Sequence, residues 1–190
     1  DVTLEEGNLQ SIGSGYVSKI GAGGEWLWTA RMASVHTNGG FLGLGVAVDS
    51  SGDAFVTGMA NRNGDGDAHF YDSDYGSGGS FLEEELDQQT AFLAKIGSDG
   101  SWEWVNGADR ASSGSISFGS DLEVSPSGDV FMMGRCSGEL RFNGTGFNCQ
   151  HYGGNTNVFI ASFDENGSLV LGMGVSCESV ASGLTWASNR

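Results

Sequence analysis

The chain has 190 residues, and its 33 glycines are more than twice the average share of about 7%. Acidic residues outnumber basic ones by 24 to 8, which gives a net charge of −16 and disfavours nucleic acid and anionic membranes as partners. Apolar residues make up 38% of the chain, enough for a core, and no apolar run approaches the roughly 18 residues of a membrane span.

The first predicted elements are strands at 15–20 and 25–30, joined by a turn that contains Gly23 and Gly24. Two β-rich runs separated by a glycine turn are typical of a β-hairpin. This hairpin recurs: residues 17–28 align with 93–104 at an offset of 76 positions. A weaker third copy, at 159–171, lies a further 67 positions along, with Leu169 and Leu171 in place of a tryptophan pair.

A second hairpin repeats at the same offset, since residues 46–58 align with 122–134. Each repeat therefore has four predicted strands, in the order A, B, C and D. They lie at 43–49, 53–58, 91–96 and 101–105 in one repeat, and at 119–125, 129–134, 157–163 and 168–173 in the next. The only helical candidate is 81–87, and the chain is predicted to be all-β.

Four-stranded antiparallel units in tandem are most simply the blades of a β-propeller. The predicted organisation is a partial blade at 1–32, full blades at 41–106 and 117–174, and a partial blade at 182–190. Propellers usually close with 4–8 blades, so we expect this chain to be a segment of a larger propeller or to be completed by other protein chains.

Two segments carry a family resemblance: KIGSDGSWEW at 95–104 and AVDSSGDAFVTG at 47–58. Both resemble the SBBP, or beta-propeller repeat, family of secreted bacterial and archaeal proteins, whose blade layout is similar to that of NHL propellers. The resemblance extends over about residues 15–175. It implies a propeller fold and an extracellular or cell-surface location, and it implies little about activity.

The long connection after Gly58 carries a candidate calcium loop. Oxygen-bearing side chains alternate along it and match a relaxed calcium-loop pattern; they belong to Asn61, Asn63, Asp65, Asp67 and Asp72. Its low charge predicts weak binding, in the range of about 10⁻⁴–10⁻³ M. The competing interpretation is a polar turn that needs no metal.

Trp26 and Trp102 begin tryptophan pairs with spacing i, i+2, which predicts that both rings of a pair lie on one side of the strand. Such rings are candidates for stacking on sugars. Recurrence in each repeat favours the other interpretation, that they fill the gap between blades.

Cys136 and Cys149 flank a stretch, 139–147, that can fold back as a small hairpin, so a disulfide between them is predicted, with two reduced cysteines as the alternative. Asn143 and Asn166 begin glycosylation sequons. Both features, with the acidity, favour an extracellular protein.

No nucleophile or metalloprotease motif accompanies His36, His69 or His151, and the acids 83–85 most simply solvate a loop. The chain is therefore predicted not to be an enzyme. The preferred function is a scaffold segment for protein–protein assembly or adhesion. The alternatives are a calcium-dependent carbohydrate-binding module that binds glycans, and an accessory propeller of a secreted polysaccharide-degrading enzyme.

Overall fold

A computed structural model describes residues 14–34, 39–61, 68–74, 81–84, 86, 89–110, 116–149, 157–175 and 183–185. The described residues form strands and turns without a helix, and every strand pair is antiparallel. No helix long and apolar enough to cross a membrane occurs among them. The all-β prediction is confirmed for this part of the chain.

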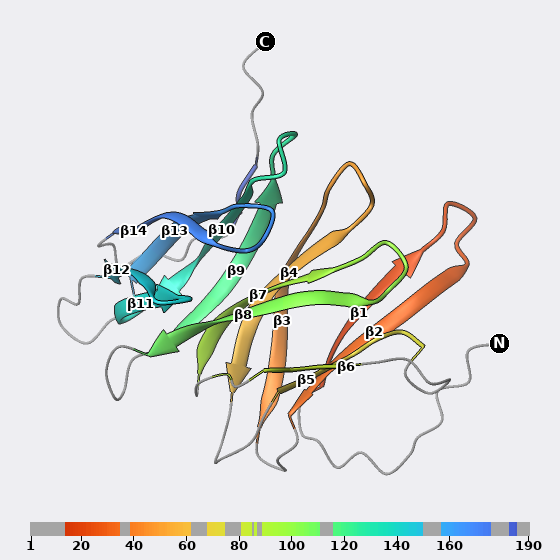
Figure 1. The fold of residues 1–190 in the computed structure, drawn as a ribbon, viewed down its shortest axis with the longest axis horizontal. Coiled ribbons are helices and arrows are strands. Elements are labelled where there is room, and N and C mark those ends of the chain that lie inside the picture. Colours follow the sequence, from red (N-terminus) through yellow and green to blue (C-terminus); the bar gives the residue numbers. More distant parts are fainter. Residues whose placement is uncertain are drawn as a thin grey trace.

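The strands form three sheets (Figure 1). The first sheet has the order β1 (Gly15–Ile20), β2 (Trp26–Ser34), β5 (Ala68–Tyr71) and β6 (Phe81–Glu84). The middle sheet has the order β3 (Gly40–Val48), β4 (Ala54–Asn61), β7 (Thr90–Ile96), β8 (Trp102–Arg110), β11 (Gly138–Phe142) and β12 (Thr145–Cys149). The last sheet has the order β9 (Ser117–Val124), β10 (Val130–Cys136), β13 (Asn157–Phe163) and β14 (Leu169–Val175).

The sequence repeat is also a structural repeat, because equivalent strands share their irregularities. The pairing of C with D strands skips one residue in each sheet: Leu27 in β2, Glu103 in β8 and Val170 in β14. The pairing of A with B strands skips Leu44 in β3 and Ser120 in β9. Such skips are β-bulges, which place one extra residue opposite a single partner. All ten strands predicted at 15–30, 43–105 and 119–173 are present within a few residues of their expected bounds.

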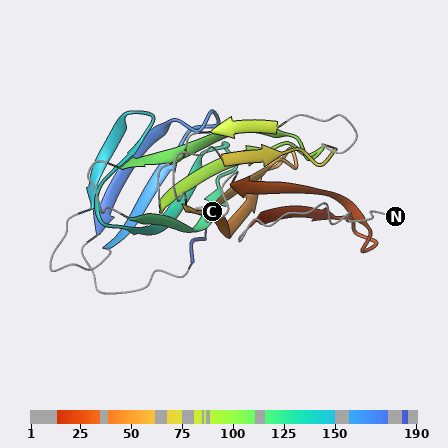
Figure 2. The ribbon, with the colours of Figure 1, turned by 90° about the horizontal axis from the view of Figure 1, so that it is seen from below.

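Both connections between B and C strands carry a hairpin that joins the preceding sheet. β5 pairs with β2, and β11 pairs with β8, so each D strand receives a partner from the following repeat. Figure 2 shows this exchange from below, with β5 and β6 beside the first sheet. The helical candidate at 81–87 is wrong, because Phe81–Glu84 is the strand β6 and pairs with β5.

Two apolar layers hold the sheets together. One, between the first and middle sheets, contains Phe41, Phe70 and Phe92; the other, between the middle and last sheets, contains Phe55 and Phe159. Burial of a large apolar side chain contributes about 1.5–3 kcal/mol, so the sheets stabilise one another through these layers.

The burial expected from strand alternation is only partly confirmed. Phe55, Phe92, Ile96, Leu122 and Phe159 are buried as predicted, and Val124 and Phe131 are half-buried. The prediction that Val46 and Val48 are buried is wrong, because both side chains are exposed. They share a face with Val56 and Ala54, toward the first sheet, and the described part of that sheet has no A or B strand opposite them.

The predicted end units are described only in small part. Residues 1–13 lie outside the described residues, and so does most of 182–190. Within 183–185 no strand forms, and the Leu184 amide donates to the carboxylate of Asp121 at 2.6 Å. The three sheets of the described residues do not close into a ring.

Candidate interaction faces

The same kind of contact, a D-strand tryptophan on a C–D turn, joins neighbouring sheets at two places. Trp28 of the first sheet donates through Nε1 to the Ser98 carbonyl, in the β7–β8 turn of the middle sheet, at 2.9 Å. A Cβ atom placed on Gly100 of that turn would lie 2.9 Å from Cδ2 of Trp28. The D strands of the first and middle sheets thus each place an aromatic ring on the C–D turn of the following sheet.

The second instance joins the middle and last sheets. The ring of Trp104 would lie 2.8 Å from a Cβ atom on Gly167, in the β13–β14 turn, and Asn106 donates to the Gly167 carbonyl at 2.8 Å. Both glycines have a positive φ, 89° and 78°, which L side chains rarely adopt. The ring therefore packs directly on a backbone that has no side chain in the way.

The bulge separates the two rings of each tryptophan pair, contrary to the expectation that both lie on one side. Trp102 pairs with Ile96, and Trp104 pairs with Lys95, so the two rings face opposite sides of the middle sheet. Trp102 faces the first sheet, where its ring meets Phe70 edge-on at 5.2 Å between ring centroids. Its Nε1 donates to the Tyr71 carbonyl at 3.2 Å, and with 5% of its surface exposed it has no ring face free to stack on a sugar.

The outward face of the first sheet exposes residues whose repeat counterparts are buried. Ile20 is 55% exposed, whereas its counterpart Ile96 is fully buried. Trp26 is 61% exposed, in contrast to Trp102, and Tyr16 is exposed where Phe92 is buried. The difference is the neighbour: the middle sheet packs on the first, and no described sheet packs on the outward face of the first.

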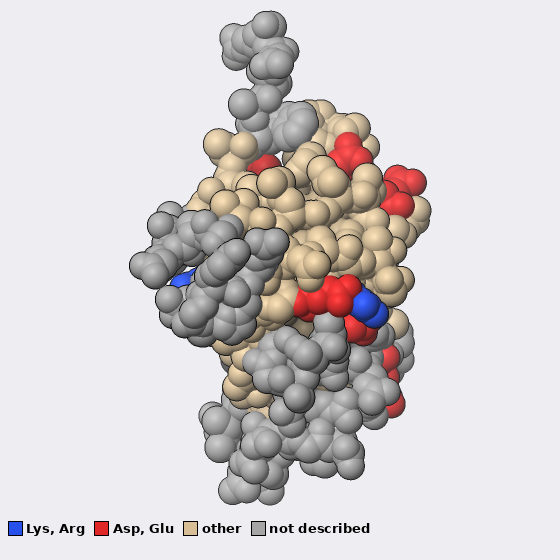
Figure 3. All heavy atoms as spheres, turned by 90° about the vertical axis from the view of Figure 1, so that its left-hand side faces the viewer, with Lys and Arg blue, Asp and Glu red and all other residues tan. Residues whose placement is uncertain are grey.

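The last sheet repeats the observation in the opposite direction. Ile160 and Val175 are partly exposed, while their counterparts Leu93 and Ala108 are buried against the last sheet. Leu171, the counterpart of Trp104, is 65% exposed, and Met173 is exposed beside it. The outer edge of β14 has no strand partner among the described residues, whereas β2 and β8 each have one. Figure 3, which faces the side of the molecule where β14 and β12 lie in Figure 1, shows a described surface that is mostly uncharged.

Lys95 forms ion pairs with two carboxylates of the middle sheet. Lys95 Nζ lies 3.0 Å from an Asp53 carboxylate oxygen and 2.8 Å from one of Glu103. Partial burial alone would raise the pKa of Asp53, but hydrogen bonds from Lys95 and the Ser98 amide hold it below its ordinary value. Burial would likewise lower the pKa of Lys95, and the two carboxylates raise it instead.

A polar cluster occupies the outward face of the first sheet near β5. His69 Nδ1 lies 2.9 Å from the Tyr71 hydroxyl, and its Nε2 lies 3.4 Å from a Glu83 carboxylate oxygen. The guanidinium of Arg31 lies over the Tyr71 ring at 4.3 Å. Sequence reasoning treated His69 and Glu83 separately, because only the pairing of β5 with β6 brings them opposite each other.

The candidate calcium residues are divided between described and undescribed chain. Asn61 ends β4, and Asp72 follows β5, where its carboxylate accepts a hydrogen bond from the Trp102 amide at 2.8 Å. Asn63, Asp65 and Asp67 lie outside the described residues. No group of three or more acidic, His or Cys side chains suited to a metal is found in the described ranges.

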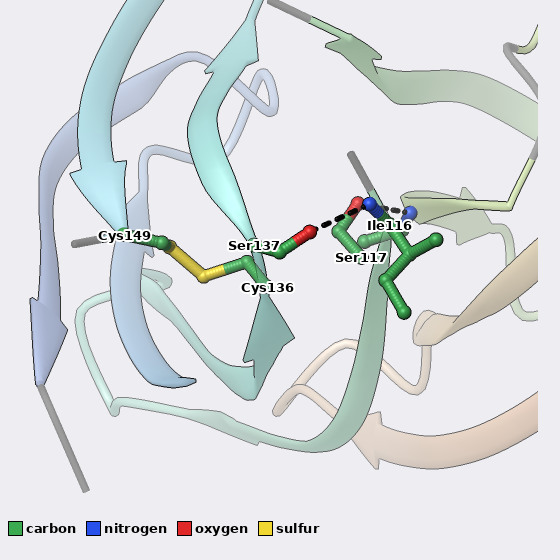
Figure 4. Close-up of a disulfide and its surroundings, with 6 residues drawn as sticks. Ile116, Ser117, Cys136, Ser137 and Cys149 are labelled. Carbon is green, nitrogen blue, oxygen red and sulfur yellow. Dashed lines mark hydrogen bonds between the residues drawn. A yellow bond between two sulfur atoms is a disulfide. The ribbon is translucent and has the colours of Figure 1, made fainter. Parts of the chain in front are cut away.

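Cys136 and Cys149 lie at disulfide distance, with their Cα atoms 6.0 Å apart (Figure 4). The expected hairpin between them is β11–β12, which turns at Asn143 and Gly144 with positive φ values of 49° and 78°. Because β10 belongs to the last sheet and β12 to the middle sheet, the cysteine pair connects two sheets. Next to it the Ser137 hydroxyl accepts from the Ile116 amide at 3.0 Å.

Both predicted glycosylation asparagines are exposed on turns. Asn143 donates through Nδ2 to the Asn106 side chain at 3.1 Å, and the Asn166 amide donates to Asp164 at 3.0 Å. Their positions leave both side chains accessible from solvent.

The sequence matches no protein-family model, and comparison with curated proteins finds no match.

Proposed function

We propose that this chain is a non-catalytic segment of an extracellular β-propeller scaffold of the SBBP kind, and that it acts by assembling with further protein units. Tandem sheets in the strand order A, B, C, D and the shared bulges support the propeller layout. The cysteine pair at disulfide distance and the two accessible sequons support an extracellular location.

One observation carries the assembly function: identical repeat positions are buried inside the stack of sheets and exposed at its two ends. Ile96 and Ile20 are the same residue at the same position, and only the one with a neighbouring sheet is covered. Exposed apolar patches on soluble proteins mark interaction sites, so the two outer faces are proposed as binding faces.

The carbohydrate-binding alternative has less support, because the recurring tryptophan of the middle sheet is enclosed between sheets. A glycan array read with and without chelator separates the two. Chelator-sensitive glycan binding would replace the scaffold proposal.

The assembly proposal is tested by the native mass of the tagged protein isolated from the medium and cell surface of its producing cells. The double variant Ile160→Asp/Met173→Asp places two charges on the outer face of the last sheet. The expected result is a complex for the unmodified protein and loss of that complex for the variant. Val170→Glu, a matched control, should behave as the unmodified protein, because its counterpart in the middle sheet is Glu103, which is itself exposed. If the unmodified protein and the double variant have the same monomer mass, the proposal fails.

A further inference from the structure

The two outer faces correspond to opposite sides of the middle sheet. The outward face of the last sheet corresponds to the side of the middle sheet that meets its successor, and it carries Ile160, Leu171 and Met173. The outward face of the first sheet corresponds to the side of the middle sheet that meets its predecessor, and it carries Ile20 and Trp26. We call the outward face of the last sheet the donor face and the outward face of the first sheet the acceptor face, because the first corresponds to the surface that packs on the second inside the chain.

From this we infer that copies of the chain associate head to tail: the last sheet of one copy packs on the first sheet of a second copy. The inference rests on the proposed assembly function and names its partner, a second copy of this chain. The contact continues the packing already present between the three sheets.

Gly24 gives the most specific support. Three equivalent C–D turns contain a glycine with φ of 86°, 89° and 78°: Gly24, Gly100 and Gly167. Gly100 is buried under Trp28 and Ser73, and Gly167 is buried under Trp104 and Asn106. A Cβ atom placed on Gly24 would meet nothing within 4 Å, and Gly24 is exposed. Gly24 is thus an uncovered turn of the kind on which a D-strand side chain packs.

Leu171 supplies the matching side chain. It stands at the repeat position of Trp28 and Trp104, on the face of the last sheet away from the middle sheet, and it is 65% exposed. In the head-to-tail contact Leu171 of one copy lies on Gly24 of the next. Leucine is smaller than tryptophan, so this contact is weaker than the two inside the chain.

The surrounding positions are also complementary in character. Ile160, Met173 and Val175 supply apolar area on the donor face, and Tyr16, Ile20 and Trp26 supply it on the acceptor face. None of these six side chains is charged; the charged groups Arg31 and Glu83 of the acceptor face lie near β5. The chain as a whole carries −16. Repulsion between copies therefore opposes association at long range, and added salt should strengthen the contact by screening it.

A contact between two different faces is heterologous, which produces a ring if the rotation closes and a filament if it does not. A ring has one defined mass, whereas a filament grows with protein concentration, so a concentration series distinguishes the two.

The test is sedimentation velocity of the purified chain over a concentration series. The expected result is reversible association that strengthens with salt. Leu171→Asp on the donor face and Trp26→Asp on the acceptor face should each raise the Kd by about 30-fold or more, the loss typical of a central interface residue. Both side chains are mostly exposed, so the fold should survive, which thermal unfolding of each variant checks.

Two matched controls lie beside these positions. Leu27→Glu and Val170→Glu change the bulge residues, whose counterpart in the middle sheet is Glu103, exposed even within the stack. Both should associate as the unmodified chain does. Leu171→Trp restores the residue of the other two sheets and should lower the Kd.

Mixing separates a head-to-tail contact from a contact between like faces. Leu171→Asp and Trp26→Asp copies each retain one intact face, so the mixture should form a 1:1 pair at concentrations at which each variant alone stays monomeric. A chain that stays monomeric at about 0.1 mM, a hundred times a micromolar Kd, overturns the inference. So does a mixture that stays monomeric. If the double variant Ile160→Asp/Met173→Asp still loses its complex in producing cells, the scaffold proposal survives and the outer faces bind a different chain.

Discussion

The comparison of Ile96 with Ile20 isolates what a neighbouring sheet contributes to stability. Each is the last residue of a C strand and lies opposite the first tryptophan of a D strand. The same isoleucine-to-alanine substitution can therefore be compared at the two positions. Ile96 packs among the apolar residues between the first and middle sheets, and Ile20 lies on the uncovered side of the first sheet. The chemistry of the substitution is identical, so only the surroundings differ.

The expected losses follow from burial. Ile96 is fully buried, and an isoleucine-to-alanine change at such a site costs about 2–5 kcal/mol, because a cavity adds to the lost transfer free energy. Ile20 is 55% exposed, so under half of its surface is removed from water, and solvent fills the space that the side chain leaves. At about 1.5–3 kcal/mol for full burial, the cost of Ile20→Ala is about 1 kcal/mol or less.

Urea unfolding followed by tryptophan fluorescence measures both variants, at protein concentrations low enough to keep the chain monomeric. A shift of the midpoint at constant slope reports the change in unfolding free energy. Equal losses for the two variants would refute the reasoning, because they would mean that Ile20 is covered within the single chain. Repeating the series at high protein concentration should increase the effect of Ile20→Ala alone, since a bound copy stabilises the folded state.

Three further predictions concern the Cys136–Cys149 pair, the carboxylate of Asp53, and the long connection between Asn61 and Asp72. Cys136→Ser removes the link between the last sheet and β12 and should cost about 3 kcal/mol by the chain-entropy estimate; reductant should lower the melting temperature of the unmodified chain and leave the variant unchanged. Because the pKa of Asp53 is lowered in the folded chain, the unfolded chain binds more protons near pH 3.8. The contribution of Asp53 to stability is therefore present above that pH and is lost as the pH falls through the lower pKa of the folded state. Asp53→Asn should flatten the acid side of the stability curve, measured as the melting temperature between about pH 2 and pH 6. If the connection binds calcium, millimolar Ca²⁺ should slow proteolysis between Asn61 and Asp72 and Asp65→Asn should abolish that protection, whereas equal cleavage rates in calcium and in chelator would exclude the site.

The sequence alone determined the elements of this protein, because their signals are local. Turns that require a positive φ, such as those at Gly100 and Gly167, occur between β-rich runs, and their recurrence identified four-stranded units. Cys136 and Cys149 were predicted to meet for the same reason, since a short hairpin with Asn143 and Gly144 at its turn returns the chain on itself.

Only the tertiary structure decided which strand pairs with which sheet and which face is covered. The sequence predicted the small hairpin at 139–147 but no strands in the long connection before Thr90, and it predicted for neither connection a hairpin that joins the preceding sheet. That pairing is set by the spatial neighbour and not by local sequence. Strand alternation placed Trp26 with Trp28, and Val46 with the core. One bulge residue reversed the first, and the second was reversed because the described part of the first sheet has no A or B strand opposite Val46. Periodicity specifies the two faces of a strand, whereas burial depends on what lies opposite, so Ile20 and Ile96 read alike in the sequence and differ in the fold.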